Sequence, residues 1–415
     1  PMASLTPESI LTIIYTSGTT GRPKGVVLTH ANMLYEGDCV EEVDVVRTSD
    51  VQLLFLPLAH VFAKVLEVSW YSVGYVMAFA ESMQTIKENL AETRPSIMCG
   101  VPRVFEKFYS AVVDQGMSAE GVRKKLFQEA LAMSVKNGEA EEAGRSLSLV
   151  DELKWKALKK LVFSKIAAGL GERLGGRMRI MLSGGAPLSK KINWFFRDAG
   201  LTIVEGFGMS ETSPVTHVNP LLGQRKEGSV GIPVSDTDAR IVDIDDPTKE
   251  VPVGEEGELV VRGPQIMAGY WNRQDETDKT IINGWLHTGD LATVDEDGYF
   301  YIVGRKKDMI NASGFKVFPD EVDEVLGSHP KILEAATIGV PDECRTETVK
   351  SFVVLQPGQS MTRDEVRDFC KEELAPYKVP FEVEFLDELP RSSVMKVLRR
   401  ELRDREIEKQ KAGGA

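Results

Sequence analysis

Short apolar runs alternate with helical patterns over the first hundred residues. Residues 10–15, 51–56 and 96–99 are aliphatic or β-branched runs bounded by turn residues, which predicts three buried strands. A helix is expected to open at Thr29 or His30. Alternation of this kind is typical of α/β layering around parallel strands.

The pattern changes twice before the last quarter of the chain. Residues 104–176 look helical and rich in Lys, Glu and Ala, with few turn residues except around Asn137 and Gly138, and their charges are expected to form a solvated face. Residues 228–302 are instead rich in glycine and in short alternating runs such as 258–262. This predicts a small β-barrel or sandwich subdomain.

From Gly304 onward the pattern resets to a compact α+β domain of about 110 residues. Its predicted helices and strands are 319–326, 335–340, 349–355, 362–374 and 381–385. The tail at 399–411 is expected to be a solvated helix. We place the boundary at the charged run 304–308, which predicts a large α/β domain over 1–304, with its β-rich subdomain at 228–303, and a small α+β domain over 305–415.

Length and charge narrow the classes of function. A chain of 415 residues exceeds the size at which single cores stop growing, so more than one domain is expected. Its 50 basic and 63 acidic residues give a net charge of −13. Nucleic-acid binding needs clustered positive charge, so this function is not expected. The four cysteines are scattered and suggest neither a zinc site nor a disulfide framework, so a reducing, cytoplasmic compartment is expected. We see no leader and no long apolar run.

The loop after the first strand is dense in small and hydroxylated residues. It holds Thr16, Ser17, Gly18, Thr19, Thr20 and Gly21, followed by Lys24. Small residues let the backbone approach a phosphate closely, and hydroxyls with one cation neutralise it. The loop does not have the Walker A spacing G-x-x-x-x-G-K-[ST]. From this loop alone, nucleotide binding and a plain hydrophilic turn are equally open interpretations.

Two further predicted strands end in glycine turns. Residues 183–187 follow the strand at 179–182, and residues 205–211 follow the strand at 201–204. Open α/β sheets bind their ligands at such strand ends.

The glycine- and threonine-rich loop is one of six blocks that together resemble a known superfamily. Residues 15–25 are similar to the signature of the AMP-forming adenylate synthetases, which include acyl-CoA synthetases, peptide-synthetase adenylation domains and luciferases. The other blocks follow in family order at 56–60, 206–211, 285–290, 304–308 and 390–396. Residues 57–62 and 100–107, with the helical insertion after them, most resemble long-chain fatty acyl-CoA synthetases. The resemblance implies a large multi-layer α/β domain followed by a small mobile α+β domain.

Roles in nucleotide binding follow from the resemblance, position by position. It implies that residues 16–24 hold the β- and γ-phosphates of ATP, that Ser210 touches the α-phosphate, and that Asp290 and Arg305 meet the ribose. The residues implied to line the adenine slot are Gly184, Gly185, Ala186, Phe207 and Gly208. A carboxylate accepts from both ribose hydroxyls, and glycines admit a flat ring against which Phe207 can stack.

The resemblance also implies which residues act in the chemistry. Glu211 would hold Mg²⁺, Lys396 would bridge the acyl carboxylate and the α-phosphate, and His60 would gate the passage between nucleotide and acyl sites. Lys307 falls at the hinge about which the small domain swings. The residues implied to face CoA are Gly314, Phe315 and Lys316.

The implied reaction has two halves. A long-chain fatty acid reacts with Mg·ATP to give acyl-AMP and pyrophosphate, and the CoA thiol then displaces AMP. Two alternatives stay open: a ligase that hands acyl-AMP to a carrier protein, and a nucleotide-binding fragment without turnover. Only 14 residues precede Tyr15, whereas family members carry a substantial N-terminal portion, so we expect that portion to be missing here. A fatty substrate implies transient contact with a membrane, although no basic amphipathic anchor stands out. The oligomeric state stays open.

Overall fold

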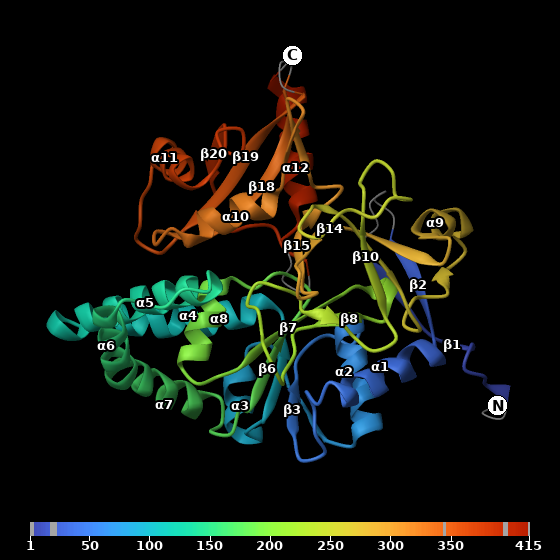
Figure 1. The fold of residues 1–415 in the computed structure, drawn as a ribbon, viewed down its shortest axis with the longest axis horizontal. Helices are drawn as coiled ribbons and strands as arrows, with labels where there is room; N and C mark the ends of the chain where they lie inside the picture. Colours follow the sequence, from blue (N-terminus) through green and yellow to red (C-terminus); the bar gives the residue numbers. More distant parts are fainter. Residues whose placement is uncertain (1–3, 17–22, 343–345, 393–396, 414–415) are drawn as a thin grey trace. The chain divides into compact units, whose positions relative to one another are not determined.

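The chain folds into two compact units, and each is described by itself. The computed structural model describes residues 4–16, 23–342, 346–392 and 397–413 (Figure 1). The first unit comprises Pro1–Ala239, Val260–His287 and Asp295–Tyr301, and the second comprises Arg240–Leu259, Thr288–Val294 and Ile302–Ala415. The domain boundary expected at residue 304 stays a prediction.

A seven-stranded sheet is the centre of the first unit. Its strand order is β4-β3-β5-β6-β7-β8-β9, and the strands from β4 to β7 run parallel. The strands are β3 (Val51–Leu54), β4 (Val76–Phe79), β5 (Ile97–Gly100), β6 (Ile180–Ser183), β7 (Ile203–Gly208), β8 (Val215–Val218) and β9 (Ile232–Pro233). All four residues of β5 are buried, as a short apolar run in the middle of a parallel sheet requires. The predicted α/β class is confirmed.

Helices connect these strands. They are α1 (His30–Glu42), α2 (Val61–Val73), α3 (Ile86–Thr93), α8 (Lys190–Asp198) and the 3₁₀-helix η3 (Ser210–Thr212). Helix α1 begins where predicted because Thr29 and Asn32 form a reciprocal cap: the Asn32 amide donates to Thr29 Oγ1 at 3.2 Å and the Thr29 amide to Asn32 Oδ1 at 2.9 Å.

The segment predicted to be helical forms a layer beside the sheet (Figure 1). It contains α4 (Pro102–Met117), α5 (Gly121–Glu142), α6 (Leu149–Leu158), the π-helix η2 (Lys159–Phe163) and α7 (Ser164–Arg173). No helix in the described part of the chain has the length and apolarity to cross a membrane. The turn residues Asn137 and Gly138 do not interrupt the helix, because α5 runs through both of them. Gly138 is buried against the Trp194 ring, where a side chain would collide, so this glycine serves close packing of α5 on α8.

The remaining strands up to β15 form two smaller sheets, one of three strands and one of five. The three-stranded sheet has the order β1-β2-β12, with β1 (Ile10–Thr16), β2 (Lys24–Thr29) and β12 (Gly269–Tyr270). The five-stranded sheet has β10 (Asp238–Val242), β11 (Gly257–Arg262), β14 (Trp285–Val294) and β13 (Ile281–Ile282), with β15 (Phe300–Arg305) beside β14; α9 (Gln274–Thr280) precedes β13. Residues 228–302 are rich in strands, as predicted, and two of these strands, β9 and β12, pair in the seven-stranded and three-stranded sheets. The barrel or sandwich subdomain stays a prediction.

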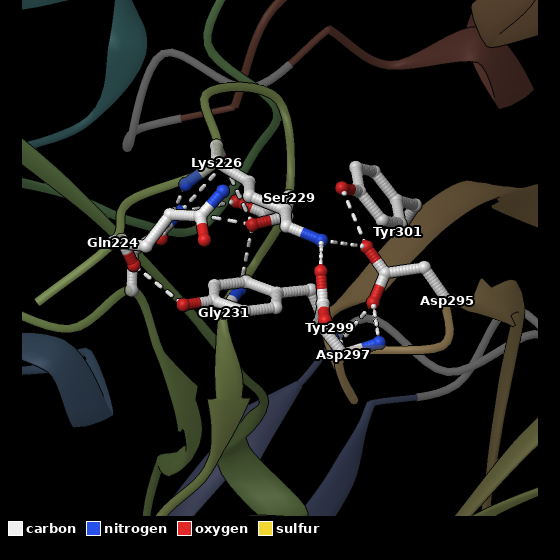
Figure 2. A network of polar contacts seen from close by, with 9 residues as sticks. Gln224, Lys226, Ser229, Gly231, Asp295, Asp297, Tyr299 and Tyr301 are labelled. Atoms are coloured by element: carbon white, nitrogen blue, oxygen red, sulfur yellow. Dashed lines mark hydrogen bonds and ion pairs between the residues drawn. The ribbon is translucent and has the colours of Figure 1, made fainter. Parts of the chain in front are cut away.

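A polar network fixes the segment before β9. Figure 2 shows Lys226 between two carboxylates of the β14–β15 turn, with its Nζ atom 2.6 Å from both Asp295 Oδ2 and Asp297 Oδ2 and 4.7 Å from the centre of the Tyr299 ring. The Tyr301 hydroxyl donates to Asp295 Oδ2 at 3.1 Å. These contacts hold residues 224–231 in place within the first unit.

The C-terminal part of the second unit is the α+β arrangement predicted. Its elements are β16 (Ile310–Ala312), β17 (Phe315–Val317), α10 (Pro319–Ser328), β18 (Ile332–Asp342), β19 (Thr346–Leu355), α11 (Arg363–Glu373), β20 (Glu382–Phe385) and α12 (Arg399–Gly413). The sheet order is β17-β16-β19-β18, with β20 parallel to β19. The tail helix is not simply solvated: Leu402 is fully buried, and Glu406 Oε2 pairs with Lys350 Nζ at 2.7 Å.

Candidate functional site

The predicted strand-end loops lie at neighbouring strands of the seven-stranded sheet. Strands β3, β5, β6 and β7 are adjacent and parallel, so their carboxyl ends meet at one edge. The Gly184 amide donates to the Gly100 carbonyl at 3.2 Å, which joins the loops after β5 and β6 directly. Residues 56–60, 100–107, 183–187 and 206–211, read as separate motifs, therefore share one site.

The residues expected to line an adenine slot occupy two of these loops. Gly184 is buried, and a Cβ atom there would lie 3.3 Å from the Phe62 ring. Gly185 and Ala186 are exposed, and the half-buried Phe207 packs edge-on against His217 with ring centres 6.0 Å apart. The geometry brings these residues to the same edge of the sheet.

Gly208 ends β7 where the chain comes back on itself. A Cβ atom at Gly208 would collide with the carbonyl group of Pro214. The Met209 amide donates to that same carbonyl oxygen at 3.2 Å, and Ser210 then begins η3. Only glycine therefore fits at this position.

Glu211 is the buried carboxylate of η3. The Tyr270 hydroxyl donates to Glu211 Oε1 at 2.8 Å, and the Met267 amide donates to the Glu211 carbonyl at 2.9 Å. Burial, together with the Glu211 charge, raises the pKa of Tyr270, so the phenol keeps its proton and stays a donor. The hydrogen bond orients the carboxylate and leaves Oε2 for another partner.

Lys24 approaches the same tyrosine from β2. Its Nζ atom lies 4.8 Å from the centre of the Tyr270 ring and 2.5 Å from Glu276 Oε2 on α9. The hydrogen bond from Lys24 lowers the pKa of the Glu276 carboxyl, which is therefore ionised. A chain of contacts thus runs Glu276–Lys24–Tyr270–Glu211. We call it the Tyr270 relay; sequence reasoning missed Tyr270 and Glu276 because 59 residues separate Tyr270 from Glu211 and no motif marks either one.

The relay suits a magnesium ion bound mainly through a phosphorylated ligand. Mg²⁺ takes one or two protein carboxylates and fills its remaining positions with water and phosphate oxygens. Glu211 supplies one oriented carboxylate, and the described part of the chain has no group of three or more His, Cys, Asp or Glu side chains that would form a closed metal cage. The donor set fits such an ion.

His60 lies at the N-terminus of α2. Its backbone adopts an extended conformation, and its carbonyl accepts from the Ala63 and Lys64 amides at 3.1 and 3.2 Å. Burial lowers the pKa of the half-buried ring, which favours the neutral imidazole. Phe62 on the same helix contacts Gly184, so His60 sits close in sequence to the sheet-edge site, while its role as a gate stays a prediction.

The expected ribose ligands are paired with each other in the second unit. Arg305 Nε lies 3.2 Å from Asp290 Oδ1, and the Asp290 side chain is buried. The next residue, Lys306, places its Nζ atom 3.0 Å from both Glu258 Oε2 and the Ile244 carbonyl. Lys307, the expected hinge, is exposed. The structure thus joins Asp290 and Arg305, and their contact with ribose stays a prediction.

The residues expected to face CoA form a hairpin in the second unit. Ser313 and Gly314 make the turn between β16 and β17, and the Gly314 amide donates to Asn311 Oδ1 at 2.8 Å. Phe315 stacks on Tyr377 with ring centres 4.7 Å apart, and Lys316 is exposed. Both rings border a concave surface lined by Ala312, Ser313, Phe315, Thr348, Val349, Pro376, Tyr377 and Val379.

Some expected site residues lie outside the described residues. These are Ser17, Gly18, Thr19, Thr20, Gly21 and Lys396. Thr16 and Lys24 on either side of the loop are described and pair across β1 and β2.

Glu205 is a second buried carboxyl, and it lies within β7. Burial raises its pKa to about 7, although hydrogen bonds to Oε1 from the Gly228 amide at 3.3 Å and from Asn193 Nδ2 at 3.0 Å partly offset the effect. Gly228 belongs to the segment that the Lys226 network holds in place. Glu205 therefore titrates near neutral pH one residue before the glycine loop.

This carboxyl makes stability depend on pH. Because its folded pKa lies above the ordinary value of 4.5, the protonated form favours folding, and that contribution is lost as pH rises through about 7. Glu205→Gln should therefore raise the free energy of unfolding by roughly 1–3 kcal/mol at about pH 8 and by little at about pH 5. Urea titrations at the two pH values measure this. Glu139→Gln, an exposed acid on α5, is the control, and an equal gain for Glu205→Gln at both pH values would contradict the assignment.

The fold and the sheet-edge loops place the chain among the α/β proteins that hold ligands at the carboxyl ends of parallel strands. Its family is shown by two matches. Residues 1–271 match the model of the AMP-binding enzyme, and residues 321–396 match the model of the AMP-binding enzyme C-terminal domain. The chain belongs to the AMP-binding enzyme family.

Curated relatives and solved structures agree with this family. The chain is 37% identical over 409 residues to a long-chain-fatty-acid–CoA ligase of Escherichia coli O6:H1, and 35% identical over 410 residues to one of Bacillus subtilis (strain 168). These alignments cover 96% and 97% of this chain but 62% and 63% of the relatives, so the chain spans less than two thirds of their length.

Two solved structures share the fold. ATP-bound MatB from Rhodopseudomonas palustris has a TM-score of 0.76 at 28% identity, covering 96% of this chain and 69% of that one. The O-succinylbenzoate coenzyme A synthetase MenE from Bacillus subtilis, in complex with ATP and magnesium ion, has a TM-score of 0.73 at 25% identity, covering 96% of this chain and 70% of that one.

Proposed function

We propose that this chain carries out the activation of a long-chain fatty acid by ATP, followed by transfer of the acyl group to CoA. The observation that carries the proposal is the Tyr270 relay, which brings a lysine and an oriented carboxylate together beside strand-end glycine loops. A lysine can bind the phosphates of Mg·ATP, and one carboxylate can bind its Mg²⁺ ion. The names of the curated relatives support the fatty acid and CoA as co-substrates.

The residues of the chain would act by holding charge in place. Lys24 and the loop before it would bind the β- and γ-phosphates, while Tyr270 keeps the Glu211 carboxylate in one orientation. When bound, Mg²⁺ supplies positive charge that neutralises the triphosphate. A carboxylate oxygen of the acid then forms a bond to the α-phosphorus, and the bond from that phosphorus to the β-phosphate oxygen breaks, so pyrophosphate leaves with the electron pair.

The second half of the proposed reaction forms a thioester. The sulfur of CoA attacks the acyl carbon, the bond to the AMP oxygen breaks, and the thiol proton is released. The concave surface beside Phe315 and Tyr377 offers two exposed rings to a ligand. We also propose a reducing, cytoplasmic location, supported by the buried free thiols of Cys39, Cys99 and Cys370.

Pyrophosphate exchange tests the proposal. The 415-residue chain should exchange labelled pyrophosphate into ATP in the presence of palmitate, and far less with acetate or without acid. Binding of Mg·ATP without exchange for any acid would instead favour a nucleotide-binding module. Exchange without thioester formation, when CoA is supplied, would favour delivery to a carrier protein.

Lys396→Ala separates the two halves. The resemblance implies that Lys396 bridges the acyl carboxylate and the α-phosphate, two anions that must approach each other during adenylation. Loss of this lysine should therefore abolish exchange but largely spare thioester formation from supplied acyl-AMP. Both half-reactions are followed on the same preparation. Lys371→Ala, which alters an exposed lysine on α11 of the same unit, is a matched variant that should leave both half-reactions intact. Equal loss of both half-reactions in Lys396→Ala would contradict the assignment.

A further inference from the structure

A short segment between β11 and β12 connects two parts of the candidate site. Residues 264–268 lead into β12, which pairs with β2. Lys24, the lysine proposed to bind phosphate, begins β2, while Glu211 lies in η3. Residues 264–268 hydrogen-bond both to the β2–α1 region and to η3 with the residue that follows it. We call them the spacer segment.

Asn32 ties the spacer segment to the start of α1. Its Nδ2 atom donates to the Pro264 carbonyl at 2.7 Å and to the Ile266 carbonyl at 3.0 Å. The side chain is buried, so water does not compete for these bonds. Two residues further on, the Ala268 amide donates to the Val27 carbonyl of β2 at 3.0 Å. The spacer segment is therefore fixed to both α1 and β2.

Other groups of the same segment hold η3. The Met267 amide donates to the Glu211 carbonyl at 2.9 Å, and the Ser213 hydroxyl donates to the Gln265 carbonyl at 2.7 Å. Ser213 and Gln265 are both fully buried, and Gln265 Nε2 donates to the Thr237 hydroxyl at 2.6 Å. The backbone that carries the Glu211 carboxylate is thus held by the spacer segment.

We propose that the spacer segment sets the separation between β2 and η3, and that Asn32 and Ser213 are positioning residues for the binding of Mg·ATP. The inference rests on the proposed function, in which Lys24 binds phosphate and Glu211 holds Mg²⁺. An ion that joins phosphate oxygens to one carboxylate needs both groups held to within about 0.5 Å. Partners that only orient a metal ligand typically change metal affinity or activity by roughly 10- to 100-fold.

Asn32→Asp tests the spacer segment while keeping the cap of α1. Aspartate retains an oxygen that accepts from the Thr29 amide, but its second oxygen cannot donate to the two carbonyl groups. The 415-residue chain is titrated calorimetrically with ATP, once with Mg²⁺ and once in excess EDTA. Mg²⁺ should tighten ATP binding by the wild-type chain. This gain should fall by about tenfold in Asn32→Asp and by about threefold in Ser213→Ala.

Matched variants separate positioning from stability. Asn89→Asp alters an asparagine on α3 that is 6% exposed, against 7% for Asn32, and whose Oδ1 atom likewise accepts from a backbone amide, at 3.2 Å. Ser69→Ala removes a fully buried hydroxyl that donates to the Val65 carbonyl at 2.7 Å. Both variants should keep the wild-type Mg²⁺ gain, whatever their melting temperatures. Thermal melting shows that each variant is folded, and Ser213→Ala carries the test if Asn32→Asp does not fold.

The outcomes distinguish this inference from the proposed function. The inference is overturned if the folded Asn32→Asp and Ser213→Ala variants keep the wild-type Mg²⁺ gain, or if the two control variants lose it equally. In both cases the wild-type chain still binds Mg·ATP, so the proposed function stands. A wild-type chain that binds no ATP, or gains nothing from Mg²⁺, would overturn the proposed function and the inference together.

Discussion

Glu211→Gln should lower palmitate-dependent pyrophosphate exchange by about 100-fold or more, since one preorganised charge near a reacting phosphate contributes that much. Glutamine keeps the shape and can still accept the Tyr270 hydrogen bond, so the variant removes charge with little change in packing. The Mg²⁺ concentration for half-maximal exchange should rise at the same time. Titrating Mg²⁺ at fixed ATP measures both effects.

Two companion variants make this result specific. Tyr270→Phe keeps the ring against Lys24 but removes the hydrogen bond, so it should lower exchange by about tenfold and also raise the Mg²⁺ requirement. Glu36→Gln alters a fully buried acid whose pKa is raised by burial, and it should leave exchange unchanged. A Glu211→Gln enzyme with the wild-type Mg²⁺ requirement would show that Glu211 does not hold the metal.

Lys24→Met should weaken the binding of Mg·ATP by about 10- to 100-fold, the range for a hydrogen bond to a charged group. Glu276→Gln should have the opposite effect and tighten the binding of Mg·ATP a few-fold. Glu276 forms an ion pair with Lys24 and therefore competes with the phosphates for this lysine. Calorimetric titration of the 415-residue chain with Mg·ATP measures both constants without requiring turnover.

The control for this pair is an exposed lysine with the same partner. Lys279 Nζ lies 3.5 Å from Glu276 Oε1 on the surface of α9. Lys279→Met should leave the dissociation constant of Mg·ATP close to that of the wild type. If Lys279→Met and Lys24→Met weaken binding equally, the effect belongs to the charge of the whole region and not to the Tyr270 relay.

Much of the fold could be predicted because its signals are local. Residues 97–100 form a buried strand from an apolar run, and α11 begins after Thr362, whose side chain accepts from the Glu365 amide. The failures come from tertiary contacts. Gly138 looks like a turn residue but lies inside α5, because Trp194 from α8 occupies the space that a side chain would need.

The candidate site could be predicted only where motifs mark it. Glycine loops at 183–187 and 206–211 are visible in the sequence, and the parallel order of β6 and β7 brings them together. Tyr270 and Glu276 carry no such signal, since a tyrosine after a glycine and an acid on a short helix are common anywhere. Their proximity to Glu211 and Lys24 depends on β12 pairing with β2.

The make-up of the second unit bears on how the protein can be dissected. Residues 240–259 and 288–294 belong to the same compact unit as residues 302–415, although they lie before the charged run at 304–308 in the chain. A fragment begun at residue 305 would leave Glu258 behind, along with the Gly289 carbonyl that accepts from the Lys306 amide at 2.9 Å. A fragment meant to represent this unit must therefore retain residues 240–259 and 288–294 together with residues 302–415.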